Sequence, residues 1–270
     1  MISASGVSEP ISIRGSVQKR NLIPSAKKVL AVASGKGGVG KSSLAVNLAV
    51  ALGKQGKKVG LLDADIYGPS VTHMMGLAGV GLTVGENDKM NPVVQFGIKT
   101  ISVGNLVPAE QAMIWRGPMV HQLLQQLMSD VNWGELDVLV LDLPPGTGDV
   151  HLTMIQTLQV DGVLLVTTPQ SIAVNDVRKC VDMFRKVNIP LIGVVENLAY
   201  FECEHGSKYY PFGKEGGRRL AEEFNIPFFG ELALMSEIME GAEAGKPYAL
   251  RDGVNPFATL SEKIIESLNL

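Results

Sequence analysis

The residues that decide the fold read GKGGVGKSS and occupy positions 35–43. They match the pattern GxxxxGK[ST], and they stand between a β-branched apolar run at 29–34 and a stretch with helical periodicity at 41–54. A loop of this kind turns its backbone N–H groups inward around a phosphate chain, and glycines leave the space that the phosphates need. The sequence therefore predicts a strand, a phosphate-binding loop and a helix in direct succession.

Each position of this loop has an expected role in binding a nucleotide. Lys41 is expected to reach the β and γ phosphates, Ser42 to ligate Mg²⁺ through its hydroxyl, and Ser43 to donate to the α phosphate. The remaining positions are expected to contact the nucleotide through the loop itself, and they are Gly35, Lys36, Gly37, Gly38, Val39 and Gly40. The alternative, a glycine-rich turn that binds nothing, is disfavoured by the strand and helix on either side.

Short β-branched runs alternate with amphipathic stretches along the rest of the chain. Strands are expected at 29–34, 58–63, 98–103, 137–142, 162–168, 190–197 and 227–232. Helices are expected at 41–54, 118–130, 149–158, 172–187, 214–224 and 256–268. Several of the strand runs are apolar on both faces, as in a parallel sheet covered by helices. This alternation predicts an α/β fold with a doubly wound, mostly parallel sheet and helices on both faces, in which ligands bind at the carboxyl ends of the strands.

The composition favours one large domain. The chain has 270 residues, of which 46% are hydrophobic and 19% charged. Residues 1–28 are rich in Ser and basic, with Glu9 as their only acid, and are expected to form a flexible arm before a domain at 29–270. Both a transit-peptide remnant and an ordinary disordered terminus fit that arm. The net charge of −3 gives no general electrostatic reason to bind nucleic acid or anionic lipid.

The cysteine count and the hydropathy pattern bear on the compartment. The chain has two cysteines, which suit a reducing compartment and give no disulfide framework. Its apolar runs are shorter than the roughly 20 residues that a membrane-spanning helix needs. We therefore expect a soluble intracellular protein without stable membrane insertion.

Acidic residues follow two of the expected strands at the edge where the phosphate loop lies. Asp63 and Asp65 come at the end of the second strand, on the same side because strand side chains alternate. Asp142 ends the fourth strand, where an acid is expected to act with Mg²⁺. Gly146 follows in a loop stiffened by two prolines, and its N–H is expected to reach the γ phosphate. For Asp149, a role in this loop and a role as helix N-cap remain equally open.

A second lysine, Lys36, lies directly after the first glycine of the phosphate loop, too early to be the usual phosphate lysine. In this the loop resembles the deviant P-loop of the MinD, ParA and nitrogenase iron-protein superfamily, whose signature lysine reaches across a dimer to the partner's nucleotide. The resemblance implies a homodimeric ATPase with Mg²⁺ as cofactor, and Lys36, Lys41, Asp65 and Asp142 as its catalytic groups. It also implies that Asp63 helps to hold Mg²⁺ and that Asp65 orients the attacking water. A solvated surface lysine is the alternative for Lys36.

Several longer segments carry a narrower resemblance. DADIYGPS (63–70), WRGPM (115–119), DLPPGTGD (142–149), VVEN (194–197) and YYPFG (209–213) occur in the order and spacing of the Mrp (ApbC) family. Members of this family look like ATP-dependent carriers of iron-sulfur clusters. The resemblance covers the chain from about residue 28 onward and implies slow ATP hydrolysis, with apo-protein clients or assembly factors as partners.

The same resemblance implies further site residues and a compartment. By the family pattern Asn197 contacts adenine. The roles of Trp115 and Arg116 stay open. Trp115 could simply pack, and Arg116 could pair with an acid of the loop at 142–149. The segment QKRNLIPSAKKVLAVASGKGG, at 18–38, also resembles the mitochondrial branch of the family, called nucleotide-binding protein-like. The expected location is therefore the mitochondrial matrix or the cytoplasm.

The segment FECEHGSKYYPFG, at 201–213, departs from the family pattern. Members that carry a cluster commonly have CxxC here, and two such pairs facing each other across a dimer give four thiolates for a [4Fe-4S] cluster. Cys203 takes the first position of that pattern, but Gly206 takes the second, so that a symmetric dimer would bring two thiolates. Two alternatives remain. Either His205 completes a metal site of two Cys and two His across the dimer, or Cys203 and His205 are simple surface residues. The glutamates beside Cys203 are expected to raise its pKa.

Three functions remain compatible with ATP binding. The first is an iron-sulfur cluster carrier, and the second is a metal-free, nucleotide-switched scaffold for an assembly partner. The third is a positioning ATPase like MinD or ParA, although the stretch 256–268 lacks the basic face that anionic membranes need. Cys180 is expected to be a core residue of its helix. The Met-containing stretch at 235–239 is expected to pack, with a dimer or client interface as its alternative.

Overall fold

A large mixed sheet forms the centre of the protein. The computed structural model describes residues 23, 25–85, 88–106, 117–148, 154–155 and 158–270. The sheet has eight strands in the order β12, β9, β8, β1, β7, β2, β6, β5. Their bounds are β1 Ala26–Ser34, β2 Val59–Asp63, β5 Val93–Gln95, β6 Ile98–Ser102, β7 Leu136–Asp142, β8 Gly162–Thr167, β9 Leu191–Glu196 and β12 Phe228–Glu231. Seven strands run parallel, and β5 pairs with β6 in the antiparallel direction.

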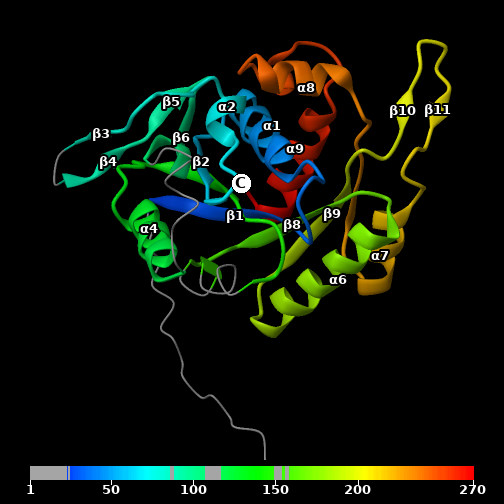
Figure 1. The fold of residues 1–270 in the computed structure, drawn as a ribbon, viewed down its shortest axis with the longest axis horizontal. Helices are drawn as coiled ribbons and strands as arrows, with labels where there is room; N and C mark the ends of the chain where they lie inside the picture. The colour runs from blue at the N-terminus through cyan, green and yellow to red at the C-terminus, as the bar shows by residue number, and fades with distance from the viewer. Residues whose placement is uncertain (1–22, 24, 86–87, 107–116, 149–153, 156–157) are drawn as a thin grey trace, which may run out of the picture.

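Helices cover both faces of this sheet (Figure 1). The helices are α1 Lys41–Lys54, α2 Val71–Met74, α4 Gly117–Ser129, α6 Ser171–Lys186, α7 Gly216–Phe224, α8 Ser236–Glu243 and α9 Pro256–Leu268, with short 3-10 turns η2 Val103–Asn105 and η3 Tyr248–Leu250. One hydrophobic core lies under α4, α6 and α7, and the other under α1, α2 and α9. Strand β1 serves both, because Ala31 and Ala33 face the first core while Leu30 and Val32 face the second.

Two short antiparallel ribbons lie outside the sheet. Strands β3 (Thr83–Val84) and β4 (Met90–Asn91) form one of them. Strands β10 (Phe201–Glu202) and β11 (Lys208–Tyr209) form the other, with Cys203 in the turn that joins them. Figure 1 shows this second hairpin, in yellow, projecting from the body of the molecule. Within the described residues, no helix is long and apolar enough to cross a membrane.

The doubly wound, mostly parallel fold is confirmed, and all seven expected strands lie in the sheet. Helices α1 and α9 have the expected bounds. Strand β5, helices α2 and α8 and the two ribbons were not expected, because elements of two to eight residues leave little periodicity to read. The residues at 1–22 and 24, together with Trp115, Arg116, Asp149 and most of the expected helix 149–158, lie outside the described residues.

The expected boundary between residues 28 and 29 falls inside β1. The side chain of Ile23 is 1% exposed, and the strand already begins at Ala26. The ammonium of Lys27 lies 2.8 Å from Asp137, and that of Lys28 lies 3.3 Å from Asp161. These basic residues looked like part of an arm in the sequence because their acidic partners are more than a hundred positions away.

Candidate nucleotide site

The loop between β1 and α1 has a backbone that requires glycine. Gly38 and Gly40 have φ angles of 80° and 81°, in the left-handed region that side chains disfavour. At Gly35, an added Cβ would lie 2.3 Å from the backbone carbonyl carbon of Asp176 on α6. The loop therefore has the shape that phosphate binding needs, and α6 packs directly against its first residue.

A cavity of about 330 Å³ opens over this loop. The expected residues that line it are Lys36, Gly37, Gly38, Gly40, Lys41, Ser42, Ser43 and Asp65. Pro145, from the loop after β7, completes one wall. The structure thus brings the loops that follow β1, β2 and β7 together, as expected for the carboxyl ends of neighbouring parallel strands.

The ammonium of Lys41 is paired with a buried carboxylate under the cavity. Its Nζ lies 2.5 Å from Oδ1 of Asp142, and the two side chains are 5% and 0% exposed. Nζ also donates to the hydroxyl of Ser42 at 3.2 Å. Burial raises the pKa of Asp142, and the positive charge of Lys41 opposes that rise. The pair therefore places the amino group of Lys41 and the carboxyl group of Asp142 in direct contact at the base of the nucleotide site.

The second carboxylate oxygen of Asp142, Oδ2, is available as a ligand for Mg²⁺. Oδ2 is buried and accepts no hydrogen bond from any residue that the structure describes. An unsatisfied carboxylate oxygen beside the Ser42 hydroxyl supplies the hard oxygen ligands that Mg²⁺ takes together with substrate phosphates. The residues fit the ion, with Ser42 and Asp142 as the expected ligands.

Asp63 is the neighbour of Asp142 across the β2–β7 pairing, but protein donors occupy both its oxygens. Oδ1 accepts from the N–H of Asp65 at 3.0 Å, and Oδ2 accepts from the N–H of Val71 at 3.2 Å and the hydroxyl of Ser102 at 2.9 Å. Burial, and then the charge of Asp142, raise the pKa of Asp63 to about 7. In this structure Asp63 organises the turn before α2, and its part in the Mg²⁺ shell stays a prediction.

Gly146 uses its N–H differently from the expectation. The N–H donates to the carbonyl oxygen of Ser34 at 2.9 Å, which ties the loop after β7 to the end of β1. The expected contact with a γ phosphate needs this bond to be exchanged, so it stays a prediction. Below the loop, Cys180 lies with its Sγ 3.8 Å from the carbonyl oxygen of Gly146. Cys180 is the core residue that its helical spacing indicated, and burial raises its pKa to about 12.

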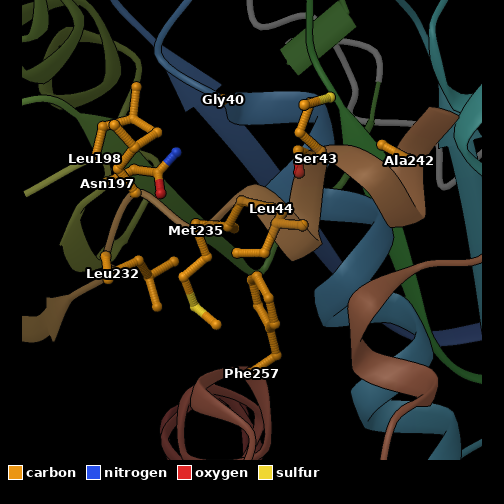
Figure 2. A pocket seen from close by; sticks show the side chains of 13 residues that line it. Gly40, Ser43, Leu44, Asn197, Leu198, Leu232, Met235, Ala242 and Phe257 are labelled. Atoms are coloured by element: carbon orange, nitrogen blue, oxygen red, sulfur yellow. The ribbon is translucent and has the colours of Figure 1, made fainter. Parts of the chain in front are cut away.

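Asn197 follows β9 and holds the phosphate loop from the side. Its amide nitrogen donates to the carbonyl oxygen of Val39 at 2.8 Å, and a Cβ on Gly40 would lie 2.2 Å from that nitrogen. Beside it lies a pocket of about 250 Å³, reached by Gly40, Ser43 and Asn197 (Figure 2). The rest of this base pocket, as we call it, is apolar and consists of Leu44, Leu198, Leu232, Ala233, Leu234, Met235, Ile238, Met239, Ala242 and Phe257.

Sequence reasoning missed most of the base pocket. Its wall comes from the chain between β12 and α8 and from α8 itself, and α8 was not among the expected helices. The signal available was the Met-containing stretch at 235–239, which was read as packing. Met235 and Met239 both line the pocket, and the alternative of a dimer or client interface for this stretch stays a prediction.

The Cys203 turn brings two potential ligands, Cys203 and His205, onto one short hairpin. The N–H of Cys203 donates to Ser207 O at 3.0 Å, and Gly206 N donates to Cys203 O at 2.8 Å. The expected rise in the pKa of Cys203 was wrong: hydrogen bonds from the backbone N–H groups of His205, and then of Ser207, lower it. His205 and Ser207 belong to the same tight turn as Cys203, whereas the side chains of the flanking glutamates are exposed to solvent. Within the described ranges, no group of three or more His, Cys, Asp or Glu side chains lies close enough together to hold a metal ion.

Comparison with known proteins places the chain in a protein family. The family described as "ParA: NUBPL iron-transfer P-loop NTPase" matches residues 25–269. The chain belongs to this family. An iron-sulfur cluster carrier protein of Deinococcus radiodurans is 52% identical over 229 residues, which are 84% of this chain and 65% of that protein. One from Aquifex aeolicus is 47% identical over 233 residues, 86% of this chain and 64% of that protein. The chain thus spans slightly less than two thirds of these two relatives.

A further relative and two solved structures complete the comparison. An Arabidopsis thaliana protein described as "Iron-sulfur protein required for NADH dehydrogenase, mitochondrial" is 47% identical over 223 residues, 82% of this chain and 71% of that protein. The nucleotide-binding protein of Archaeoglobus fulgidus in complex with ADP is 38% identical, with a TM-score of 0.73 over 82% of this chain and 88% of that one. MinD of Pyrococcus horikoshii with Mg-ADP has a TM-score of 0.66 at 21% identity, covering 88% and 95%, and shares the fold. The iron-transfer NTPase family therefore accounts for both the fold and the phosphate loop.

Proposed function

We propose that this member of the iron-transfer NTPase family is a slow, Mg²⁺-dependent ATPase that works as a homodimer and carries iron-sulfur clusters to apo-proteins. One observation carries the ATPase part: the buried pair of Lys41 and Asp142, with an unsatisfied oxygen of Asp142, lies under a cavity bounded by the phosphate loop. The solved relative that is 38% identical holds ADP, which supports a nucleotide ligand here. The names of the curated relatives support the cluster-carrying part.

In this proposal the cavity over the phosphate loop and the base pocket bind different parts of one nucleotide. The cavity over the loop offers N–H groups and the ammonium of Lys41 to a phosphate chain. The base pocket offers apolar walls and the amide of Asn197 to a purine. Gly40 and Ser43 line both hollows, so the phosphates and the base of one nucleotide would meet at these residues.

Catalysis in this proposal depends on four side chains of the same subunit. Mg²⁺ at Ser42 and Asp142 would supply positive charge against the phosphates when it is bound. Lys41 then leaves Asp142 for the nucleotide, because phosphate replaces the carboxylate as its counter-charge. Asp65 lies in the cavity wall, where it can orient a water molecule towards the γ phosphate.

Lys36 provides the argument for a homodimer. It lines the cavity, is partly exposed, and its ammonium forms no ion pair with any described residue. An extra cation here can neutralise developing charge on the nucleotide of a facing subunit. ATP would thus close the dimer, and hydrolysis would relax it.

Two lysine substitutions test the ATPase and the dimer together. Lys41→Ala is expected to abolish ATP binding, whereas Lys36→Ala is expected to bind ATP and to lose turnover and ATP-dependent dimerisation. Fluorescent-nucleotide titration, phosphate release and analytical ultracentrifugation measure the three properties, and Lys57→Ala serves as a lysine control outside the site. Unchanged turnover in Lys36→Ala would show that the lysine in trans is not needed.

A second set of measurements tests cluster carriage. Protein purified without oxygen is expected to contain iron and labile sulfide, and Cys203→Ala is expected to lose both. Cys180→Ala is the matched control, because its thiol is buried in the core. Iron that survives in Cys203→Ala would exclude this thiol as a ligand.

Gly206 favours a second candidate, a nucleotide-switched scaffold that holds no metal itself, because a glycine supplies no ligand at the second position of the family's CxxC pattern. Protein without iron and sulfide that still recruits a partner in an ATP-dependent way would support the scaffold. For either function we propose a reducing compartment, the cytoplasm or the mitochondrial matrix, in line with the description of the Arabidopsis relative.

A further inference from the structure

We propose that a groove beside the Cys203 turn binds a basic polypeptide segment that inserts an apolar side chain. The groove has a volume of about 570 Å³ and lies between the hairpin β10–β11 on one side and the start of α8 on the other. Residues from the end of β12 and from the chain before α9 also line it. We call it the acidic groove, and it lies outside both the phosphate cavity and the base pocket.

Four carboxylates line the acidic groove: Glu202 and Glu204 from the hairpin, Glu231 from β12 and Glu237 from α8. Among the described residues none of them forms an ion pair, and no lysine, arginine or histidine lines the groove. Two cations lie beside the groove: Lys208 is opposite Glu202 in the β10–β11 pairing and lies over the ring of Tyr200 at 4.0 Å, and Arg251 lies over the ring of Tyr248 at 5.1 Å. Four carboxylates against these two cations leave the groove with a net negative charge.

Apolar side chains accompany these charges. Phe201 is 46% exposed, Leu234 39% and Val254 99%, and all three line the groove together with Tyr248 and Pro256. An exposed apolar patch rimmed by charge is typical of a protein-binding surface. Lysine or arginine side chains of a bound segment would pair with the four carboxylates, and an apolar side chain would contact the apolar residues. This complementarity favours a basic segment as the occupant.

A bare metal ion fits the groove less well. It would gain nothing from the apolar residues, and in the described part of the chain no three metal-binding side chains gather here. A basic segment with an apolar side chain makes use of both the charged and the apolar residues of the groove.

The position of the groove connects it to the proposed function, on which its assignment to a client rests. Glu202 and Glu204 are the neighbours of Cys203 in the chain, so an occupant would lie beside the thiol. On the opposite side, the segment 233–235 lines both the groove and the base pocket. A nucleotide and a client segment would thus contact the same three residues, and binding of one should alter the affinity for the other.

Fluorescence anisotropy with short labelled peptides tests this proposal on the full chain. The probe has lysines flanking a central Leu-Leu pair, and two matched peptides carry glutamate in place of lysine or serine in place of leucine. We expect the probe to bind, the glutamate peptide not to bind, and the serine peptide to bind at least tenfold more weakly. Affinity for the probe should also fall as salt is raised, because ion pairs at the rim are screened.

Variants locate the binding. Glu202→Gln with Glu204→Gln is expected to weaken the probe about tenfold, which is the sum of two rim ion pairs. Phe201→Thr, which keeps a β-forming residue in β10, should weaken it by a similar factor. The charge-matched control, Glu222→Gln with Glu266→Gln, changes two exposed glutamates outside the groove and should leave affinity unchanged.

The outcomes separate this proposal from the proposed function. Equal weakening of probe binding in the groove variant and in its control would overturn the proposal. A peptide of residues 11–22 of this chain that binds more tightly than the probe would also overturn it, because the occupant would then be the chain's own segment. Fluorescent-nucleotide binding is measured on the same samples. A wild-type protein that binds the nucleotide but does not bind the probe would refute the groove and leave the ATPase standing.

Discussion

At the scale of single residues, the Lys41–Asp142 pair is the most consequential contact in the site. Both side chains are almost completely buried, and one oxygen of Asp142 has no hydrogen-bond partner in the described part of the chain. A buried charge that loses its counter-charge is costly, whereas replacing both partners by neutral groups is often tolerated. The pair therefore holds the nucleotide-free site together while it keeps Lys41 within reach of a phosphate.

We expect Lys41→Met to lower the free energy of unfolding by about 3 to 5 kcal/mol in the absence of nucleotide, because Asp142 is left buried and unpaired. The double variant Lys41→Met with Asp142→Asn should recover a large part of that loss. Urea denaturation of the wild type, both single variants and the double variant gives the coupling free energy between the two side chains. A double variant no more stable than Lys41→Met would contradict the ion-pair interpretation.

Gly206 is the residue where the cluster question can be decided. Its φ of 76° lies in the left-handed region, but an ideal Cβ there would meet no heavy atom within 4 Å. A side chain at this position is therefore opposed by the backbone conformation alone, at roughly 1 kcal/mol.

Gly206→Cys restores CxxC, and we expect it to increase the iron and sulfide bound per dimer, because a symmetric dimer then offers four thiolates. Iron and sulfide are measured after anaerobic reconstitution. Gly206→Ser is the control, since it has the same backbone cost and no thiol. Equal iron content in the two variants would mean that the two hairpins do not face each other across the dimer.

At the scale of elements, the end of β9 joins the nucleotide site to α7. Asn197 contacts the phosphate loop through Val39, while its neighbour Glu196 accepts a hydrogen bond from the N–H of Gly217, in the first turn of α7. The side chain of Glu196 is 1% exposed, and burial raises its pKa. The negative carboxylate at the N-terminus of α7 is favoured by the helix dipole, which partly offsets the burial.

The raised pKa of Glu196 makes a prediction about stability and pH. Because the folded protein holds this proton more tightly than the unfolded chain, the contribution of Glu196 is fully present below its ordinary pKa of 4.5 and is lost as pH rises through the raised value. Glu196→Gln cannot titrate, so its free energy of unfolding should fall less than that of the wild type over this range. Urea denaturation from pH 4.5 to neutrality measures the difference, and Glu222→Gln is an exposed control. Parallel curves for wild type and Glu196→Gln would contradict the assignment.

At the scale of the whole molecule, the base pocket and the acidic groove share one wall. The segment 233–235 separates them, and it leads directly into α8. Its backbone is tied to both sides, because Leu232 donates to the carbonyl of Glu196 at 2.8 Å and Leu234 to that of Tyr200 at 2.7 Å. A change in the base pocket therefore reaches the chain that enters the Cys203 hairpin.

We expect Mg-ATP to increase the hydrogen-exchange protection of α8 and of residues 198–210, in addition to that of the phosphate loop. The physical reason is that a nucleotide would fill the base pocket and restrict its wall. Exchange of the wild type without nucleotide, measured by mass spectrometry, provides the baseline, and adding Mg-ATP to Lys41→Ala, which is expected not to bind ATP, should leave its exchange unchanged. Protection confined to residues 35–43 would show that the wall does not transmit binding.

The sequence alone determined the features that depend on local chemistry. A glycine-rich loop between an apolar run and a helical stretch indicates a phosphate site because few other residues can form that backbone, and buried parallel strands are recognisable because both their faces are apolar. The positions of the seven expected strands and of α1 and α9 follow from such local patterns. The family resemblance carried by DADIYGPS and DLPPGTGD was confirmed for the same reason, since it rests on contiguous segments.

Only the tertiary structure decided which distant groups meet. The pairing of Lys41 with Asp142, the use of Gly146 N–H by Ser34 and the three donors on Asp63 join residues far apart or involve backbone atoms that no side-chain pattern reveals. The lowered pKa of Cys203 likewise follows from the turn geometry and not from its charged neighbours. Short elements such as α8 acquire their place by packing against the rest of the fold, and for this reason the base pocket and the acidic groove became visible only once the chain was folded.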